Sequence, residues 1–190
     1  MPRKKRNFKQ HGYYHVYNRG NRKNPIFIDT QDKIVFIKNL KIYTKRFNIE
    51  LEGYCLMYNH YHLILKTKNN PQDLSKMMQA FTTKFCLYYN KKYGLVGHVF
   101  QGRYNAVYVA PNWNLERIKK YLKNNPVKEG LVKHPGDYRW LRIQEGQAPR
   151  RHQGGTKEIK FPEIGTKGVL SVGFGFLKSA ICKLLNPEAG

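Results

Sequence analysis

The chain has 190 residues, with 35 Lys or Arg against 12 Asp or Glu, which gives a formal net charge of +23 at pH 7. Hydrophobic residues make up 41% of it and aromatic residues 14%, enough for one sizeable core, so a wholly disordered chain is excluded. A chain this basic predicts a polyanionic partner, and nucleic acid is favoured over an acidic membrane surface.

The first half of the chain predicts a strand, a helix and a hairpin. Residues 13–18 are rich in β-prone side chains and predict a strand. Residues 30–47 predict a helix, because apolar residues recur there at helical spacing behind a capping residue. Residues 49–57 and 61–67 predict two strands joined by a connection of hairpin length.

The second half predicts a long helix, a strand and another helix. The segment Asn70-Pro71-Gln72-Asp73 is typical of a helix start, and this helix should end near Gly94. A short strand follows at residues 106–109, and residues 113–124 predict a helix that is stopped by Pro126. The order β-α-β-β-α-β plus a C-terminal helix predicts an α+β fold, a ferredoxin-like antiparallel sheet backed by two helices on one face.

Changes in composition predict where the folded domain ends. We expect a basic N-terminal arm at residues 1–11 and a single domain at residues 12–144. Residues 145–165 are rich in Gly, Pro and charge and are expected to be a linker, followed by a tail at residues 166–190 to which no role is assigned.

The cysteines and apolar segments exclude further classes of protein. Cys55, Cys86 and Cys182 form no C-x-x-C pair, so neither a disulfide framework nor a cysteine-based zinc site is supported. The longest apolar stretch, near residues 168–177, is about half as long as a bilayer span, and the first ten residues lack the apolar segment of a secretory signal. We therefore expect a soluble cytoplasmic protein with no membrane partner.

Acidic residues are absent from residues 1–28 and from residues 74–115. A single Lys or Arg is ordinarily a solvated surface charge, but a whole window without an acid is harder to explain in that way. The two windows are therefore expected to form the surface that holds a polyanion. The candidate nucleic-acid contacts in them are Arg3, Lys4, Lys5, Arg6, Arg19, Arg22, Lys23, Lys84, Phe100, Gln101, Arg103 and Tyr104.

The loop at residues 97–104 combines glycines, an arginine and aromatic residues. Glycine lets a backbone approach a partner closely, Arg103 can bind a phosphate or a base edge, and Phe100 and Tyr104 can stack on bases. The alternative is a turn between a helix and a strand whose aromatic side chains are packed inside, and the residues leave both interpretations open.

His60 and His62 are separated by one residue in a predicted strand, so both imidazoles project from the same face. Two imidazoles at this spacing can bind one divalent metal and leave positions open for a phosphate oxygen. The alternative is a pair of partly buried histidines that hydrogen-bond locally.

Tyr121 lies at the edge of the buried stripe of the last predicted helix, and Asn125 follows it by four residues. The phenol and the carboxamide share a helix face if the final turn holds. A phenolic oxygen can attack phosphorus and form a phosphotyrosine ester, but its ordinary pKa of about 10 means that it needs help from a metal or from cations. The alternative is that Tyr121, one of 14 tyrosines, only packs.

Four blocks of the sequence resemble one known family. They are YHVYNRGNRKNPIF at residues 14–27, GYCLMYNHYHLILKT at 53–67, GHVFQGRYNAVYV at 97–109 and YLKNNPVKEGLV at 121–132. In this order they resemble the REP-associated tyrosine transposases, within the larger single-tyrosine HUH transposase family. One departure is Tyr58, which stands where the family usually has proline.

The resemblance implies that His60 and His62 bind the metal, that Asn125 helps to complete the metal shell, and that Tyr121 is the nucleophile. It implies Mg²⁺ or Mn²⁺ as cofactor and single-stranded, hairpin-bearing DNA as partner. The expected activity is DNA cleavage and strand transfer through a 5′-phosphotyrosine, by a bacterial, nucleoid-associated monomer or homodimer. Two alternatives stay open: a non-catalytic ferredoxin-like protein that binds DNA or RNA, and a domesticated nuclease that no longer transposes.

Overall fold

The predicted order of strands and helices is confirmed by a computed structural model, which describes residues 6–110 and 113–144. The predicted linker and tail at residues 145–190, together with Arg3, Lys4 and Lys5, lie outside this range. The elements are β1 (Tyr13–Arg19), α1 (Thr30–Arg46), β2 (Glu50–Leu56), β3 (His60–Lys66), α2 (Asp73–Tyr93), β4 (Asn105–Val109), α3 (Trp113–Lys128) and β5 (Leu141–Ile143), with short 3-10 turns η1 (Asn21–Lys23) and η2 (Pro135–Asp137).

The five strands form one sheet in the order β4-β1-β3-β2-β5, and all four pairings are antiparallel. Strand β5 was not predicted, because three residues are too few to give an alternating pattern. It pairs with β2 where Gly53 lies opposite Ile143. A Cβ atom at position 53 would lie 2.8 Å from Ile143 Cδ1, so glycine is what lets the two strands approach here.

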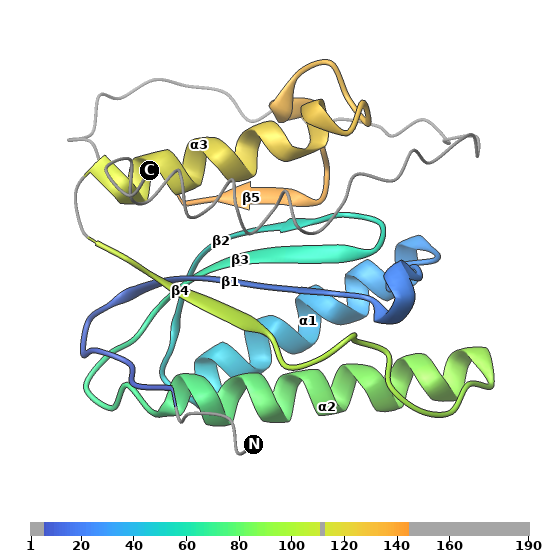
Figure 1. Ribbon diagram of the computed structural model, residues 1–190, viewed down its shortest axis with the longest axis horizontal. Coiled ribbons are helices and arrows are strands. Elements are labelled where there is room, and N and C mark those ends of the chain that lie inside the picture. Colours follow the sequence, from blue (N-terminus) through green and yellow to red (C-terminus); the bar gives the residue numbers. More distant parts are fainter. Residues whose placement is uncertain (1–5, 111–112, 145–190) are drawn as a thin grey trace, which may run out of the picture. The chain divides into compact units, whose positions relative to one another are not determined.

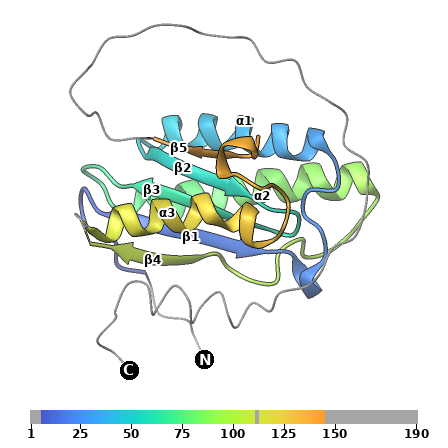
Figure 2. The ribbon, with the colours of Figure 1, turned by 90° about the horizontal axis from the view of Figure 1, so that it is seen from above.

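Helices α1 and α2 lie on one face of the sheet and α3 lies on the other (Figures 1 and 2). Strict alternation along β1 and β3 assigns their side chains to the two faces. Tyr14 and Val16 of β1, with Tyr61, Leu63 and Leu65 of β3, join the hydrophobic core. The residues between them project toward α3, and both faces of these central strands are therefore buried.

Helix α3 continues to Lys128, so the predicted stop before Pro126 is wrong. Proline cannot donate a backbone hydrogen bond inside a helix, and this ordinarily ends one. Here the turn is held by its neighbours, since the N–H of Glu129 donates to Asn125 O at 3.1 Å and the N–H of Leu131 donates to Pro126 O at 2.9 Å. Burial of Leu122 and Asn125 adds packing that offsets the lost hydrogen bond.

The start of α1 is joined to the end of α2 by the buried carboxylate of Asp32. Asp29 and Asp32 form a reciprocal capping box at the helix start. The Asp32 side chain also accepts hydrogen bonds from Lys92 Nζ at 2.8 Å, Tyr93 Oη at 2.7 Å and Tyr88 Oη at 3.0 Å. These contacts fix the two helices against each other on the core face of the sheet.

We expect Asp32→Asn to lower the free energy of unfolding by about 1.5–3 kcal/mol at pH 7, because it removes the buried charge that accepts hydrogen bonds from Lys92, Tyr93 and Tyr88, while Lys92 keeps its ion pair with Asp29. Burial alone would raise the pKa of Asp32, but hydrogen bonds from Lys92, Tyr93 and backbone N–H groups hold it below the ordinary value. The carboxylate therefore stabilises the fold above its unfolded pKa of about 4, and this stabilisation is lost as the pH falls through the lower folded pKa.

Urea unfolding at pH 7 and at pH 3 measures both effects. Asp73→Asn, which removes a partly exposed ion pair with Lys76, serves as the control and should cost about 1 kcal/mol or less. An Asp32→Asn protein as stable as the wild type at pH 7 would contradict the role given to this network.

Candidate active site

The predicted histidines and the predicted tyrosine meet between β3 and α3. His60 and His62 project from β3 toward α3, with ring centroids 5.1 Å apart. The ring of Tyr121, on α3, lies edge-on to His62 with centroids 5.7 Å apart. Asn125 is one helical turn beyond Tyr121 in the continued last turn of α3, is also buried, and lies close enough to Tyr121 to act on the pKa of its phenol.

Burial keeps both histidines neutral. It lowers the pKa of His60 to about 3, with a further contribution from the nearby Arg19 guanidinium. Burial also lowers the pKa of His62 well below its ordinary value, assisted by His15 and His60. A neutral imidazole keeps a nitrogen lone pair, which is the form that binds a metal.

The phenol of Tyr121 is protonated at neutral pH. Burial raises its pKa to about 12, while the Asn125 side chain acts in the opposite direction. Lys128 brings its ammonium to 5.9 Å from the centre of the Tyr121 ring. A nucleophile in this setting must lose its proton as it reacts.

His15 belongs to the site although the sequence analysis did not single it out. Its Nε2 atom lies 2.9 Å from His62 Nδ1, and both side chains are fully buried. Because Nδ1 of His62 is engaged, its Nε2 atom remains available, and within the described part of the chain that atom has no hydrogen-bond partner. Alternation along β1 was the available signal, since it places His15 on the same face as Tyr17 and Arg19.

Glu129 was missed as well, because the helix was expected to end before it. Tyr121, Asn125 and Glu129 follow each other at four-residue intervals along α3 and the turn that ends it. Glu129 Oε1 lies 3.8 Å from His60 Nε2. Burial raises the pKa of Glu129, and the nearby guanidinium of the buried Arg19, predicted as a DNA contact, acts in the opposite direction.

The donors at this site are of the types that bind a divalent metal ion. Two neutral imidazoles, one carboxamide and one carboxylate offer the nitrogen and oxygen ligands that such ions accept. The Nε2 atom of His62 and the Nδ2 atom of Asn125 are buried without a partner among the described residues. In the same part of the chain, no three His, Cys, Asp or Glu side chains converge on one point, so the carboxamide of Asn125 would be needed.

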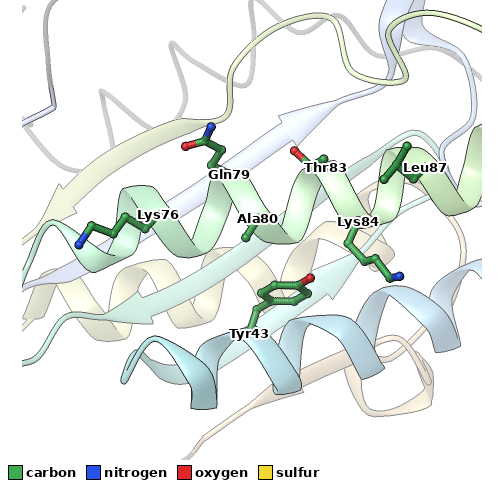
Figure 3. A pocket seen from close by; sticks show the side chains of 7 residues that line it. All are labelled: Tyr43, Lys76, Gln79, Ala80, Thr83, Lys84 and Leu87. Atoms are coloured by element: carbon green, nitrogen blue, oxygen red, sulfur yellow. The ribbon is translucent and has the colours of Figure 1, made fainter.

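Among the described residues, the predicted DNA contacts fall into more than one place: Arg6, Phe100, Gln101, Arg103 and Tyr104 line one groove, and Arg19, Arg22, Lys23 and Lys84 do not line it. Arg22 and Lys23 lie exposed in η1, and Gln101 and Arg103 lie exposed in the loop before β4. Lys84 lies on α2 beside a shallow hollow of about 400 Å³, with Tyr43 of α1 on its other side (Figure 3). Contact with DNA stays a prediction for all of them.

The two aromatic residues of this loop are mostly buried. Phe100 packs against Tyr61 and Phe85 in the core, as the packing alternative for the loop predicts. Tyr104 is 8% exposed, and the guanidinium of Arg6 lies 4.0 Å from the centre of its ring. Base stacking by Phe100 would therefore require it to leave the core.

Three comparisons relate the chain to known proteins. The family model described as "Transposase IS200 like" matches residues 8–125, more than half of the chain. A solved structure of a REP-associated tyrosine transposase bound to a REP hairpin has 16% sequence identity and a TM-score of 0.59, and the match covers 74% of this chain and 82% of that one. This likeness shows a shared fold.

A Deinococcus radiodurans R1 protein assigned as a transposase has 16% identity and a TM-score of 0.44, over 65% of this chain and 97% of its own. The search of curated proteins finds no match. Across the described residues, no helix has both the length and the apolar character needed to cross a bilayer. The match of the family model over residues 8–125 shows that the chain belongs to the IS200-like transposase family.

Proposed function

We propose that the chain is a metal-dependent endonuclease and strand transferase that cleaves single-stranded, hairpin-bearing DNA through a 5′-phosphotyrosine, in the manner of REP-associated tyrosine transposases. The observation that carries this proposal is the position of the Tyr121 phenol against the neutral His60–His62 pair. Membership of a transposase family supports it, as does a fold shared with a transposase bound to a REP hairpin.

The reaction that fits this geometry is a phosphoryl transfer to tyrosine. The Oη atom of Tyr121 attacks the scissile phosphorus, and the bond from phosphorus to the 3′-oxygen breaks. The phenolic proton is released and the departing 3′-oxygen takes up a proton, so a free 3′-hydroxyl and a 5′-phosphotyrosyl ester remain. Attack by a second 3′-hydroxyl reverses the step and joins new ends, because the number of phosphoester bonds is unchanged.

A metal ion would be held by His60, His62 and Asn125. When bound, Mg²⁺ or Mn²⁺ supplies Lewis-acid polarisation of the scissile phosphate. The chain itself contributes the buried Arg19 beside His60, which can neutralise charge on the phosphate, and Lys128 beside the tyrosine ring. His15 orients His62 through the contact between His15 Nε2 and His62 Nδ1. The Asn125 side chain lies beside the Tyr121 phenol.

A non-catalytic nucleic-acid-binding protein would account for the net charge of +23 but not for the site. That alternative does not explain why His15, His60 and His62 are buried together with the Tyr121 phenol. Burying these groups without full hydrogen bonding lowers the stability of the fold. A chain that only binds would be expected to fill this space with apolar side chains. The catalytic interpretation is therefore the better supported of the two.

Tyr121→Phe should abolish covalent attachment to DNA while leaving DNA affinity within about twofold, since only one hydroxyl is removed. A labelled hairpin oligonucleotide with an unpaired flank, incubated with Mn²⁺ and run on a denaturing gel, measures the adduct. Tyr43→Phe, the same removal of a hydroxyl on α1 at the opposite face of the sheet, is the matched control and should keep the adduct. An SDS-stable adduct in the Tyr121→Phe protein would show that another residue is the nucleophile.

His60→Ala should weaken Mn²⁺ binding by at least 10-fold and abolish the adduct, because a single imidazole is a poor anchor for the ion. Titration of Mn²⁺ followed by electron paramagnetic resonance measures the affinity without any reaction. The exposed His11 provides a control, and His11→Ala should leave the Mn²⁺ affinity unchanged. Unchanged Mn²⁺ binding in His60→Ala would remove His60 from the proposed metal site.

His15→Phe should lower the Mn²⁺ affinity by about 10–100-fold, because the imidazole that orients His62 is lost. His15→Gln should recover part of the affinity, since an amide can still hydrogen-bond to His62 Nδ1. The same resonance titration measures both variants, and urea midpoints show whether the fold is kept. Equal Mn²⁺ affinities in the wild type and a folded His15→Phe protein would exclude a positioning role.

A further inference from the structure

The turn between β2 and β3, at Tyr58 and Asn59, is held by hydrogen bonds from the segment that follows β1. The N–H of Gly20 donates to Asn59 O at 2.8 Å, and the N–H groups of Ile26 and Phe27 both donate to Tyr58 O at 3.2 Å. These three hydrogen bonds fix the backbone of Asn59 directly before the first residue of β3.

The carboxamide of Asn59 has one orientation that satisfies both of its neighbours. Its Nδ2 atom donates to Lys23 O, the carbonyl oxygen of the last residue of η1, at 3.1 Å. A carbonyl oxygen can only accept, so the carboxamide must turn its nitrogen to this side. The Oδ1 atom then faces the ring of His60 and lies 2.8 Å from its Nδ1 atom. Asn59 therefore presents an acceptor to His60.

An acceptor at this position decides which ring nitrogen of His60 carries the proton. The buried imidazole is neutral and so has a single N–H group. On the other side of the ring Glu129 Oε1 is also an acceptor, but it lies 3.8 Å from His60 Nε2, which is beyond hydrogen-bond distance. The proton therefore stays on Nδ1, where Asn59 Oδ1 accepts it, and the lone pair stays on Nε2.

The two histidines of the proposed metal site thus share one arrangement, although different groups hold them. The Nδ1 atom of His62 contacts His15 Nε2 at 2.9 Å, and the Nδ1 atom of His60 contacts the Asn59 carboxamide. In both rings Nε2 remains as the nitrogen that can bind an ion. A hydrogen bond to the opposite nitrogen is the usual way in which a metal-binding histidine is oriented and its tautomer fixed.

The orientation of Asn59 depends in turn on η1, because the last residue of η1 supplies the carbonyl group. Arg22 and Lys23 have positive φ angles of 52° and 64°, a conformation that residues other than glycine rarely adopt. The turn closes tightly, since a Cβ atom at Gly20 would lie 2.0 Å from Asn24 O. These constraints place Lys23 O where it meets the carboxamide.

We infer that Asn59 is a positioning residue for the proposed metal site: it holds His60 in the tautomer whose Nε2 atom is free, and η1 sets its orientation. The inference rests on the proposed function, because it takes His60 as a metal ligand. A change in the conformation of η1 reaches His60 through two hydrogen bonds, one from Asn59 Nδ2 to Lys23 O and one from His60 Nδ1 to Asn59 Oδ1.

The test reads the tautomer directly, in the absence of metal and DNA. Long-range ¹H–¹⁵N NMR of protein labelled with ¹⁵N-histidine distinguishes an Nδ1–H ring from an Nε2–H ring, and the signals missing in His60→Ala identify His60. We expect an Nδ1–H ring in the wild type. Asn59→Leu removes the acceptor and should give an Nε2–H ring or a mixture of both tautomers, while Asn59→Asp keeps an acceptor and should keep the Nδ1–H ring.

Titration of Mn²⁺ followed by electron paramagnetic resonance gives the second measurement. Asn59→Leu should lower the Mn²⁺ affinity by about 10–100-fold, and Asn59→Asp should recover most of it. Asn69→Leu removes a carboxamide at an exposed position in the connection between β3 and α2, and it should change neither the tautomer nor the affinity. Urea midpoints show whether each variant is folded.

Gly20→Ala tests the part played by η1, because the added Cβ atom must displace the turn that carries Lys23 O. It should shift the ring signals of His60 and introduce the Nε2–H form. Unchanged His60 signals in a folded Gly20→Ala protein would exclude the link to η1.

An Nδ1–H ring of His60 in a folded Asn59→Leu protein would overturn the inference, as would an unchanged Mn²⁺ affinity. Failure of the proposed function looks different. In that case the wild type forms no adduct with DNA and Mn²⁺, although the NMR spectra still show a His60 tautomer that depends on Asn59.

Discussion

The antiparallel pairing of β1 with β3 is the constraint on which the rest of the structure depends. It sets Tyr17 opposite His62 and Arg19 opposite His60, and it places His15 close enough to contact His62. Because side chains alternate, the same register sends Tyr61 and Leu63 into the core. A slip of one residue would exchange the two sets, so the burial of the core also fixes the position of the proposed catalytic groups.

Helix α3 converts this polar sheet face into an enclosed site. Its apolar stripe includes the buried Ile118 and Leu122, and the helix brings the Tyr121 ring against His15 and His62. The enclosure removes water from polar groups that would otherwise hydrogen-bond to it. Several of their atoms have no hydrogen-bond partner among the described residues. The protein thus carries a locally unfavourable arrangement, which the core on the other side of the sheet must outweigh.

Much of this could be predicted from the sequence because local patterns were strong. Side-chain alternation and helix caps predicted the strands and helices from β1 to α3. The spacing of His60 and His62 predicted that their side chains share one face of the sheet. The predicted end of α3 was wrong because packing overrides the helix-breaking effect of Pro126. Glu129 was missed for the same reason. The contact of His15 with His62 could be predicted only by knowing which strands pair. The groove lined by residues of β1, α2 and the loop of residues 97–104 combines segments that only the folded chain brings together.

The low pKa of His60 and His62 affects how protons would compete with an ion at the proposed metal site. An imidazole with a pKa of about 3, as burial gives His60, is already free of its proton across the whole physiological range. An ion that arrives at this site displaces no proton from that ligand. At the proposed metal site, the affinity for an ion would therefore depend on the ligand geometry and not on the protonation of His60 within the physiological pH range.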